Sequence, residues 1–236
     1  LEHYSNYTPG EGQANLVTVT IPEGYDRLAK EAFYNNAQIT TFNLPSSLKL
    51  IGESAFENCG ALTSITLNDG LENIGKKAFV GTNLTEISFP HSLRIINDAA
   101  FADLRIEDLK FNAGLYYIGN TAFGLNSAIT LNTIQIPASV KFIGACAFYG
   151  REYQDVYFLG ENAPIMPMGG SVYINNADGG NTAFPANTLM GNNRFHPGTK
   201  GQMPTVTDMK DDANCGYANR ENYYNNGGKL STEAAK

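Results

Sequence analysis

Apolar residues recur along this chain with a period of 22 to 25 residues, and the pattern returns seven times between Leu16 and Phe184. Each unit opens with an apolar residue, a second follows three residues later, and a third two residues after that, as at Ile39, Phe42 and Leu44. The last two alternate with polar residues, which is the period of a strand with one buried face. The pattern therefore predicts a short strand in the first half of every unit.

The second half of each unit is equally regular. After a turn residue, usually proline or asparagine, come an apolar anchor, an isoleucine that glycine often follows, and an Ala-Phe pair, as at Ala55 and Phe56. The glycine is expected to permit a tight corner or a positive φ. The phenylalanines are expected to stack as an aromatic column opposite the strands. These are Phe33, Phe56, Phe79, Phe101, Phe123 and Phe148.

A single unit of this size cannot bury its own apolar face. Stacked units can, because the strand of each pairs with the strand of the next and the apolar side chains form one continuous core. Seven parallel strands spaced about 4.8 Å apart would form a sheet about 34 Å long. The sequence therefore predicts a solenoid: a β-rich arc with a parallel concave sheet and short helical or irregular turns on its convex side.

The stretch from Ile39 to Cys59, ITTFNLPSSLKLIGESAFENC, resembles the signature LxxIxLPxSLxxIGxxAFxxC almost position for position. That signature marks the BspA-type, or Treponema-type, bacterial surface leucine-rich repeats. The resemblance is close over residues 16–158 and reaches Phe184 through a degenerate last unit. It implies a leucine-rich repeat solenoid, on a secreted or surface-anchored bacterial protein, that serves mainly in adhesion and protein recognition.

Three regions follow from where the repeats begin and end. Residues 1–15 are polar and turn-rich and are expected to form an N-terminal cap over the first strand. Residues 16–184 form the solenoid, with an inserted loop near 165–180. Residues 185–236, rich in Asn, Gly and Asp, form a C-terminal cap or an irregular extension.

The composition of the chain limits the kinds of partner that it is expected to bind. The net charge of −7 comes without a basic cluster, so nucleic-acid binding is not expected. No apolar run approaches 18 residues, so the chain carries no predicted transmembrane segment. The chain begins at Leu1 rather than Met, and we interpret it as a mature fragment whose targeting sequence has been removed. Location outside the cell or at its surface therefore rests on the family resemblance, and a monomer is expected.

Residues suited to catalysis or metal binding are sparse. The three cysteines, Cys59, Cys146 and Cys215, are expected to be free thiols rather than a disulfide framework. The three histidines show no ligand spacing, and no serine or cysteine lies in a nucleophile motif. The NNADGGN stretch at 175–181 resembles a calcium loop in composition but lacks its alternating carboxylates and late glutamate. We predict no enzyme, no metal and no cofactor.

The outward side chains of the predicted strands remain as a candidate binding surface, because solenoids bind through extended concave sheets. A second interpretation stays open, since Thr and Ser also simply suit a solvated strand. The candidate residues are Thr18, Thr20, Thr41, Asn43, Ser64, Thr66, Glu86, Ser88, Asp108, Lys110, Thr133, Gln135, Asp155 and Tyr157.

The first functional hypothesis is adhesion, with this surface binding a protein ligand such as a host matrix component or another surface protein. The alternative is a glycan-binding module. Glycan sites usually contain exposed aromatic platforms, and the candidate face has only Tyr157. An enzyme is disfavoured because no catalytic group of residues is visible.

Overall fold

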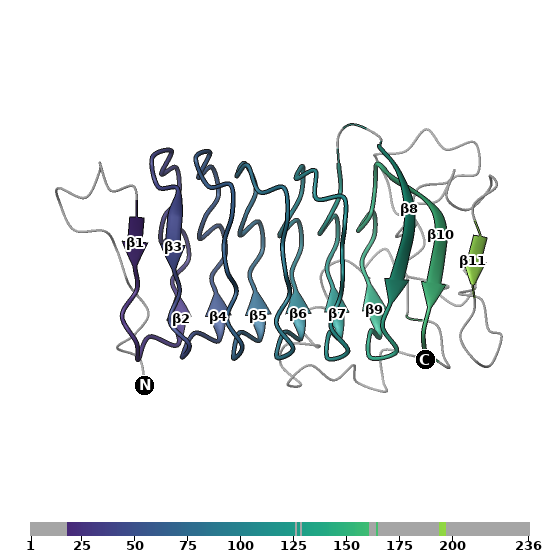
Figure 1. The fold of residues 1–236 in the computed structure, drawn as a ribbon, viewed down its shortest axis with the longest axis horizontal. Coiled ribbons are helices and arrows are strands. Elements are labelled where there is room, and N and C mark those ends of the chain that lie inside the picture. Colours follow the sequence, from purple (N-terminus) through teal and green to yellow (C-terminus); the bar gives the residue numbers. More distant parts are fainter. Residues whose placement is uncertain (1–17, 126, 128, 161–163, 165–193, 197–236) are drawn as a thin grey trace.

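The computed structural model describes residues 18–125, 127, 129–160, 164 and 194–196 of the chain. These residues contain eleven β-strands and no helix. The repeats form coils that stack side by side along one axis, as Figure 1 shows, and every pair of neighbouring strands is parallel. The predicted solenoid of parallel strands is confirmed.

The longest sheet comes from the second half of the repeats. It has six parallel strands of two residues each, and in each strand the second residue is buried in the core. The strands, in sheet order, are β2 (Arg27–Leu28), β4 (Leu50–Ile51), β5 (Asn73–Ile74), β6 (Ile95–Ile96), β7 (Tyr117–Ile118) and β9 (Phe142–Ile143).

The other wall of the solenoid has strands only at its two ends. At one end, β1 (Thr18–Thr20) pairs with β3 (Thr41–Asn43). At the other, β8 (Ile129–Ile136), β10 (Arg151–Phe158) and β11 (Arg194–His196) form a three-stranded sheet. The three coils between them carry no strand at the corresponding positions, 63–67, 85–89 and 107–111. The expectation of one uninterrupted sheet along this wall is therefore wrong for the middle coils.

Glycines follow four of the six strands of this wall, at Gly52, Gly75, Gly119 and Gly144. A Cβ on Gly52 would lie 2.6 Å from the carbonyl carbon of Ala29, and one on Gly144 would lie 2.3 Å from the backbone nitrogen of Asn120. Glycine thus lets the backbones of adjacent coils approach closely on this wall. Positive φ is not its role: the left-handed residues come two positions later, as at Ser54 (φ 54°) and Cys146 (φ 55°). The prediction of positive φ at these glycines was wrong.

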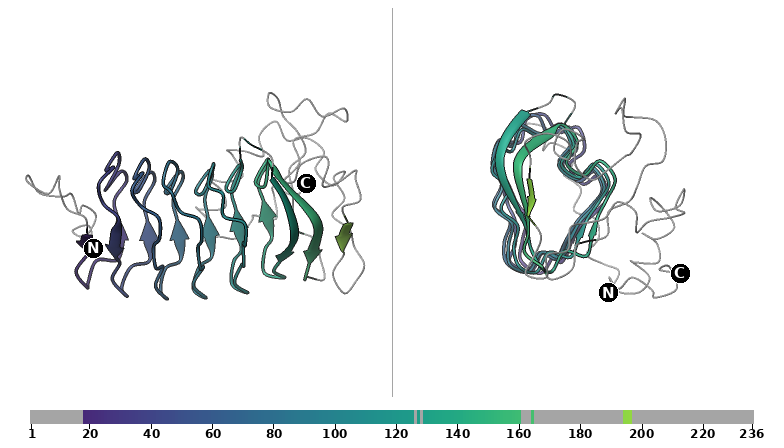
Figure 2. Two further views of the ribbon diagram at one scale, coloured as in Figure 1. Left: turned by 45° about the horizontal axis from the view of Figure 1, so that its top comes forward. Right: turned by 90° about the vertical axis from the view of Figure 1, so that its right-hand side faces the viewer.

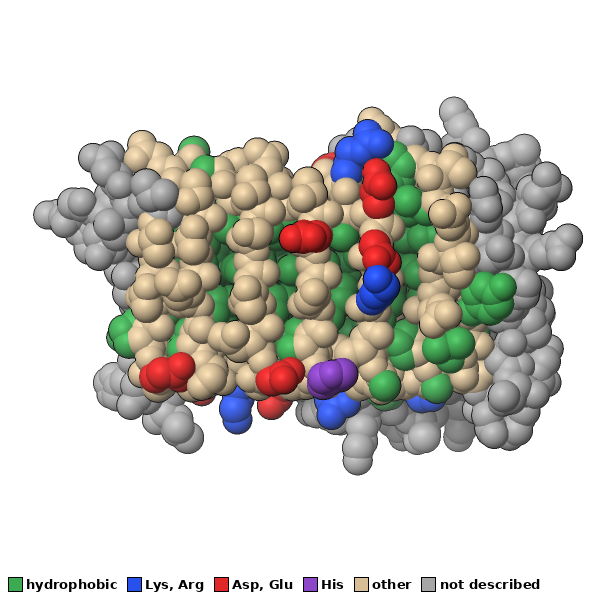
Figure 3. All heavy atoms as spheres, in the orientation of Figure 1, with side chains coloured by type: hydrophobic (Ala, Val, Ile, Leu, Met, Phe, Trp, Pro, Cys, Tyr) green, Lys and Arg blue, Asp and Glu red, His purple; other side chains and the backbone are tan. Residues whose placement is uncertain are grey.

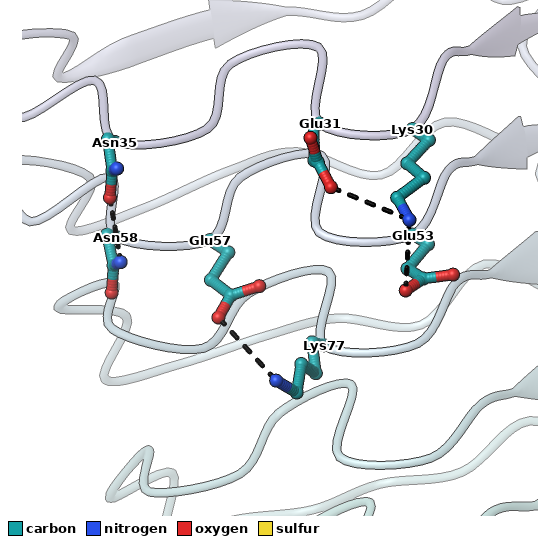
Figure 4. A network of polar contacts seen from close by, with 7 residues as sticks. All are labelled: Lys30, Glu31, Asn35, Glu53, Glu57, Asn58 and Lys77. Carbon is teal, nitrogen blue, oxygen red and sulfur yellow. Dashed lines mark hydrogen bonds and ion pairs between the residues drawn. The ribbon is translucent and has the colours of Figure 1, made fainter.

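The turn around each Ala-Phe pair links successive coils. The backbone N–H groups of Glu31, Phe33 and Asn35 donate to the carbonyls of Glu53, Ala55 and Glu57 at 2.8, 2.8 and 2.9 Å. The side chains of Asn58 and Asn35 continue this ladder with a hydrogen bond of 2.8 Å, shown in Figure 4. The turn is thus a hydrogen-bonded layer in its own right, although it is not a regular strand.

Ion pairs at the surface lie on the same turns. Lys30 lies 3.6 Å from both Glu31 and Glu53, and Lys77 lies 4.0 Å from Glu57 (Figure 4). Exposed pairs of this kind contribute about 0–1 kcal/mol each, because water screens them and ordering the side chains costs entropy. The backbone ladder therefore matters more to the turn than these charges do.

The phenylalanines of the Ala-Phe pairs form the predicted aromatic column. Neighbouring rings lie 5.0–5.6 Å apart and within 14° of parallel, from Phe33 at one end to Phe148 at the other. All of these rings are 0–2 % exposed. Phe42 and Phe89, from the opposite wall, contact the column edge-on. Both halves of the repeat therefore share one core.

Polar side chains at fixed repeat positions also bridge coils. The Ser92 hydroxyl donates to the carbonyl of Leu71 at 2.8 Å and accepts from the backbone N–H of Gly70 at 2.8 Å. Ser47 makes the same pair of bonds to Tyr25 and Gly24. Where a serine precedes the anchor leucine, as at Ser47 and Ser92, it therefore holds its turn to the one before it.

One cation lies fully buried near the end of the stack. The guanidinium of Arg151 is 0 % exposed and donates to the backbone carbonyls of Phe123, Ile106 and Leu104 at 2.7, 2.5 and 2.6 Å. Burial lowers the pKa of Arg151, because the charged form loses water. Leu104 lies two coils before Arg151, so this side chain connects coils that are not adjacent.

The structure tests some of the other sequence predictions and leaves others outside the described residues. Cys59 and Cys146 are free thiols, and Cys59 is fully buried, with its Sγ 3.1 Å from the carbonyl oxygen of Phe33. Residues 1–15, the loop near 165–180 and Cys215 lie outside the described residues. The segment 185–236 contributes β11, which continues the last sheet by pairing with β10.

Candidate functional site

The predicted binding residues lie along the interrupted wall, and we call the outer surface of this wall the polar face. Figure 3 looks onto this face and shows mostly uncharged polar side chains and backbone. All of the predicted residues from Thr18 to Gln135 are exposed, and Tyr157 is half-buried. The structure thus places these predicted side chains on one continuous surface.

Register aligns the polar residues at the N-terminal end of the face. Thr18 pairs with Thr41, and Thr20 pairs with Asn43. The amide of Asn43 donates to the Thr20 hydroxyl at 3.0 Å, so these neighbours satisfy part of each other's hydrogen-bonding capacity. This end offers short hydroxyl and amide groups without charge.

The middle of the face introduces charge. Glu86 and Ser88 are exposed on one coil, and Asp108 and Lys110 follow on the next. Asp108 and Lys110 form an ion pair of 2.5 Å with side chains 72 % and 83 % exposed. Such an exposed pair adds little to stability, so its groups remain available to an incoming ligand. Acidic and basic side chains gather around one coil of this surface in Figure 3.

The C-terminal end of the face is the regular three-stranded sheet. Thr133 pairs with Asp155, and Gln135 pairs with Tyr157. Strand β11 continues this register, since Arg194 pairs with Asp155 and His196 pairs with Tyr157. The sequence prediction missed Arg194 and His196. Their signal was the Arg-Phe-His triplet, which repeats the polar–apolar–polar alternation of the strand before it.

Titratable groups with the largest changes in pKa lie in the core rather than on the polar face. Burial raises the pKa of the Cys59 thiol to about 11. Burial also raises the pKa of Tyr153 to about 12, against the opposing influence of the Arg151 charge. In both cases burial favours the neutral form of the side chain. The two raised pKa values therefore reflect packing in the core rather than a catalytic centre.

Among the described residues, no cluster of three or more His, Cys, Asp or Glu side chains has a metal-binding arrangement. His91 is exposed on a turn, and its backbone N–H donates to the Asp69 carboxylate at 3.2 Å. The calcium-like stretch at 175–181 lies outside the described part of the chain. In that described part, no helix is long and apolar enough to cross a bilayer.

The chain matches a known protein family. The model for the BspA type leucine rich repeat region matches six copies over residues 11–130 and 100–165. Comparison with curated proteins gave no match. The repeats found by the family model include the coils that carry the polar face from Thr18 to Tyr157.

Solved structures show the same kind of repeat. A leucine-rich repeat protein from T. pallidum shares 28% identity at a TM-score of 0.52, over 65% of this chain and 76% of that one. A leucine-rich repeat protein from Bacteroides ovatus shares 27% identity at a TM-score of 0.47, over 62% of this chain. The match covers 44% of the length of the Bacteroides ovatus protein.

Proposed function

Since the chain belongs to the BspA-type leucine-rich repeat family, we propose that it acts at the bacterial cell surface as an adhesin that binds a protein ligand through the polar face. Proteins of this solenoid family are normally non-enzymatic. The ligand belongs to the host extracellular matrix or to another surface protein. A curved or flat solenoid wall recognises such partners by many contacts spread along its length.

The observation that carries this proposal is the uninterrupted exposure of polar side chains over successive coils. A solvated strand needs no particular charge pattern, but here the charged residues of the face collect in its middle coils, at Glu86, Asp108 and Lys110. This clustering favours binding at the middle of the face. Charged groups steer encounter and discriminate between partners more strongly than hydroxyls do.

A direct test measures binding of the purified protein to a panel of purified matrix and surface proteins, with a glycan array in parallel. The informative pair of variants is Lys110→Glu on the polar face and Lys49→Glu next to β4 on the six-stranded wall. Both lysines are exposed, so each variant makes the same charge change on a different wall.

The proposal expects Lys110→Glu to change affinity and Lys49→Glu to leave it unchanged. Glycan binding without protein binding would favour the alternative of a carbohydrate-recognition module. Equal effects of the two variants would place the binding site off the polar face.

A further inference from the structure

The six-stranded wall carries a second apolar cluster that is separate from the core. In its two-residue strands the second residue faces inward, so the first faces away from the core. We call these first residues the outer row. They are Arg27, Leu50, Asn73, Ile95, Tyr117 and Phe142.

The side chains of the outer row become more apolar and less exposed along the stack. Arg27 is exposed and Leu50 and Asn73 are half-buried, whereas Tyr117 and Phe142 are only 3% and 4% exposed. The rings of Tyr117 and Phe142 stack at 5.0 Å and 4°. Ile95 and Tyr116 pack against them to complete the cluster. The apolar end thus spans β6, β7 and β9.

The described residues supply no second layer over this cluster. They hold strands and turns only, and the other strands belong to a different wall of the coil, as the end-on view in Figure 2 shows. Two long side chains next to the outer row in the sequence bond to backbone carbonyls. Arg94 donates to the carbonyl of Gly114 at 3.0 Å, and Lys141 donates to that of Ala138 at 2.9 Å. Two aromatic rings on an outward row need a further cover to reach such low exposure.

We propose that the chain's own C-terminal segment, residues 197–236, docks on this cluster through its tyrosines. The segment begins after β11, whose coil is two coils beyond that of β9. Two such steps span only about 10 Å along the stack. In the coils before β11, the chain passes from the wall of the polar face to the six-stranded wall within a few residues, as from Ile136 to Phe142.

The composition of the segment fits the cluster. It contains Tyr217, Tyr223 and Tyr224, and aromatic rings favour stacked or edge-on contact with other rings. A tethered segment also has an effective concentration on the order of millimolar, which exceeds that of a second copy at ordinary protein concentrations. At the other end of the stack, next to β1, the outer row begins with the exposed Arg27.

The absence of tryptophan from the chain makes a clean test possible. A Tyr117→Trp variant of the full chain carries a single reporter in the cluster, and Phe142→Trp provides a second. Tyr34→Trp, at a tyrosine that is 45% exposed, is the matched exposed reference. Acrylamide quenching should be several-fold weaker for the two cluster reporters than for the reference.

Replacing Tyr217, Tyr223 and Tyr224 together by Ser should raise quenching of both cluster reporters toward the reference while the circular dichroism spectrum is unchanged. Replacing Tyr4 and Tyr7 by Ser should not. Three results would overturn the proposal: quenching unchanged by the C-terminal substitutions, quenching raised by the N-terminal ones, or protection that appears only at high protein concentration. The second assigns the cover to the N-terminal segment, and the third assigns it to a second copy.

Discussion

The phenyl rings of Phe101 and Phe123 lie 5.4 Å apart and 2° from parallel, although 21 residues separate them in the sequence. This contact repeats from coil to coil, so each ring between Phe33 and Phe148 is held on both sides by the same residue type. Each coil therefore packs against the next through the phenylalanine column, and the rings in the middle of the column contribute most to stability.

Phe79→Ala should strongly destabilise the protein. The ring is 0% exposed and stacks on Phe56 at 5.1 Å and on Phe101 at 5.0 Å. Removal of a buried phenylalanine costs about 3–5 kcal/mol. Urea denaturation measures the effect, with Ser64→Ala on the exposed polar face as the control, expected to change stability by less than about 0.5 kcal/mol. Equal midpoints for Phe79→Ala and the parent would contradict the role of the column.

Arg151→Met should also destabilise the fold, by roughly 2–4 kcal/mol, because three buried carbonyls lose their donor and each unmet group carries a desolvation cost. Methionine retains much of the side-chain length, so lost packing contributes less than lost hydrogen bonds. The exposed Arg105→Met is the matched control. A variant at Arg151 as stable as the parent would show that burying the guanidinium offsets all that its hydrogen bonds contribute.

Stability should fall as the pH rises through the alkaline range. Cys59 has a pKa of about 11 in the folded chain against an ordinary value of 9.0, and Tyr153 has one of about 12 against 10.0. Above pH 9 the unfolded chain releases protons that the folded chain retains, so the free energy of unfolding decreases as pH rises.

Urea titrations between pH 8 and about 11 measure this slope. The slope should be shallower for Cys59→Ala than for the parent, whatever the stability of that variant at pH 8. An identical slope would mean that Cys59 ionises equally readily in the folded and unfolded chain.

Tyr157→Ala and Asp108→Lys should weaken binding once a ligand is identified, because interface energy concentrates in a few aromatic and charged residues. Thr20→Ala should have little effect. Tyr149→Ala is the matched control, since this tyrosine is 39% exposed and lies outside the predicted polar face. Surface plasmon resonance with melting curves for each variant separates lost contacts from lost folding. Parent-like binding by both polar-face variants would redirect attention to the chain near 165–180.

A chelator should leave the melting temperature unchanged, because the apolar core and the coil-bridging hydrogen bonds are sufficient to hold the stack. Melting with and without EDTA, followed by calcium addition, tests this expectation. A fall of many degrees with EDTA that calcium restores would identify the stretch at 175–181 as a calcium site.

The coil architecture and the phenylalanine column could be predicted because both follow from spacing alone. Phe33 and Phe148 occupy the same place in repeats of nearly equal length, and equal repeats bring equal positions together. The exposure of Thr18 to Gln135 followed from alternation in the same way. A binding role for these residues does not follow from spacing, because a solvated wall and a binding wall have the same period.

Other features depend on distances between backbones, which the pattern does not contain. The role of Gly52 depends on the close approach of the Ala29 backbone, since a Cβ at Gly52 would lie 2.6 Å from the Ala29 carbonyl carbon. Arg151 occupies the repeat position of Cys59, yet nothing in the spacing indicates that its guanidinium would turn inward to three carbonyls. The strand β11 was missed because its coil follows an irregular segment, which hides the register of Arg194 with Asp155.

The reach of Arg151 sets a limit on how this array can lengthen or shorten. Where a coil touches only its neighbours, one repeat can be duplicated or lost and the flanking surfaces still match. Arg151 departs from that rule, because its guanidinium needs carbonyls from both of the coils before its own, including those of Phe123 and Leu104. An array shortened to fewer than two coils before Arg151 should therefore lose part of this anchor, whereas repeats gained or lost on the N-terminal side of Leu104 should leave it intact.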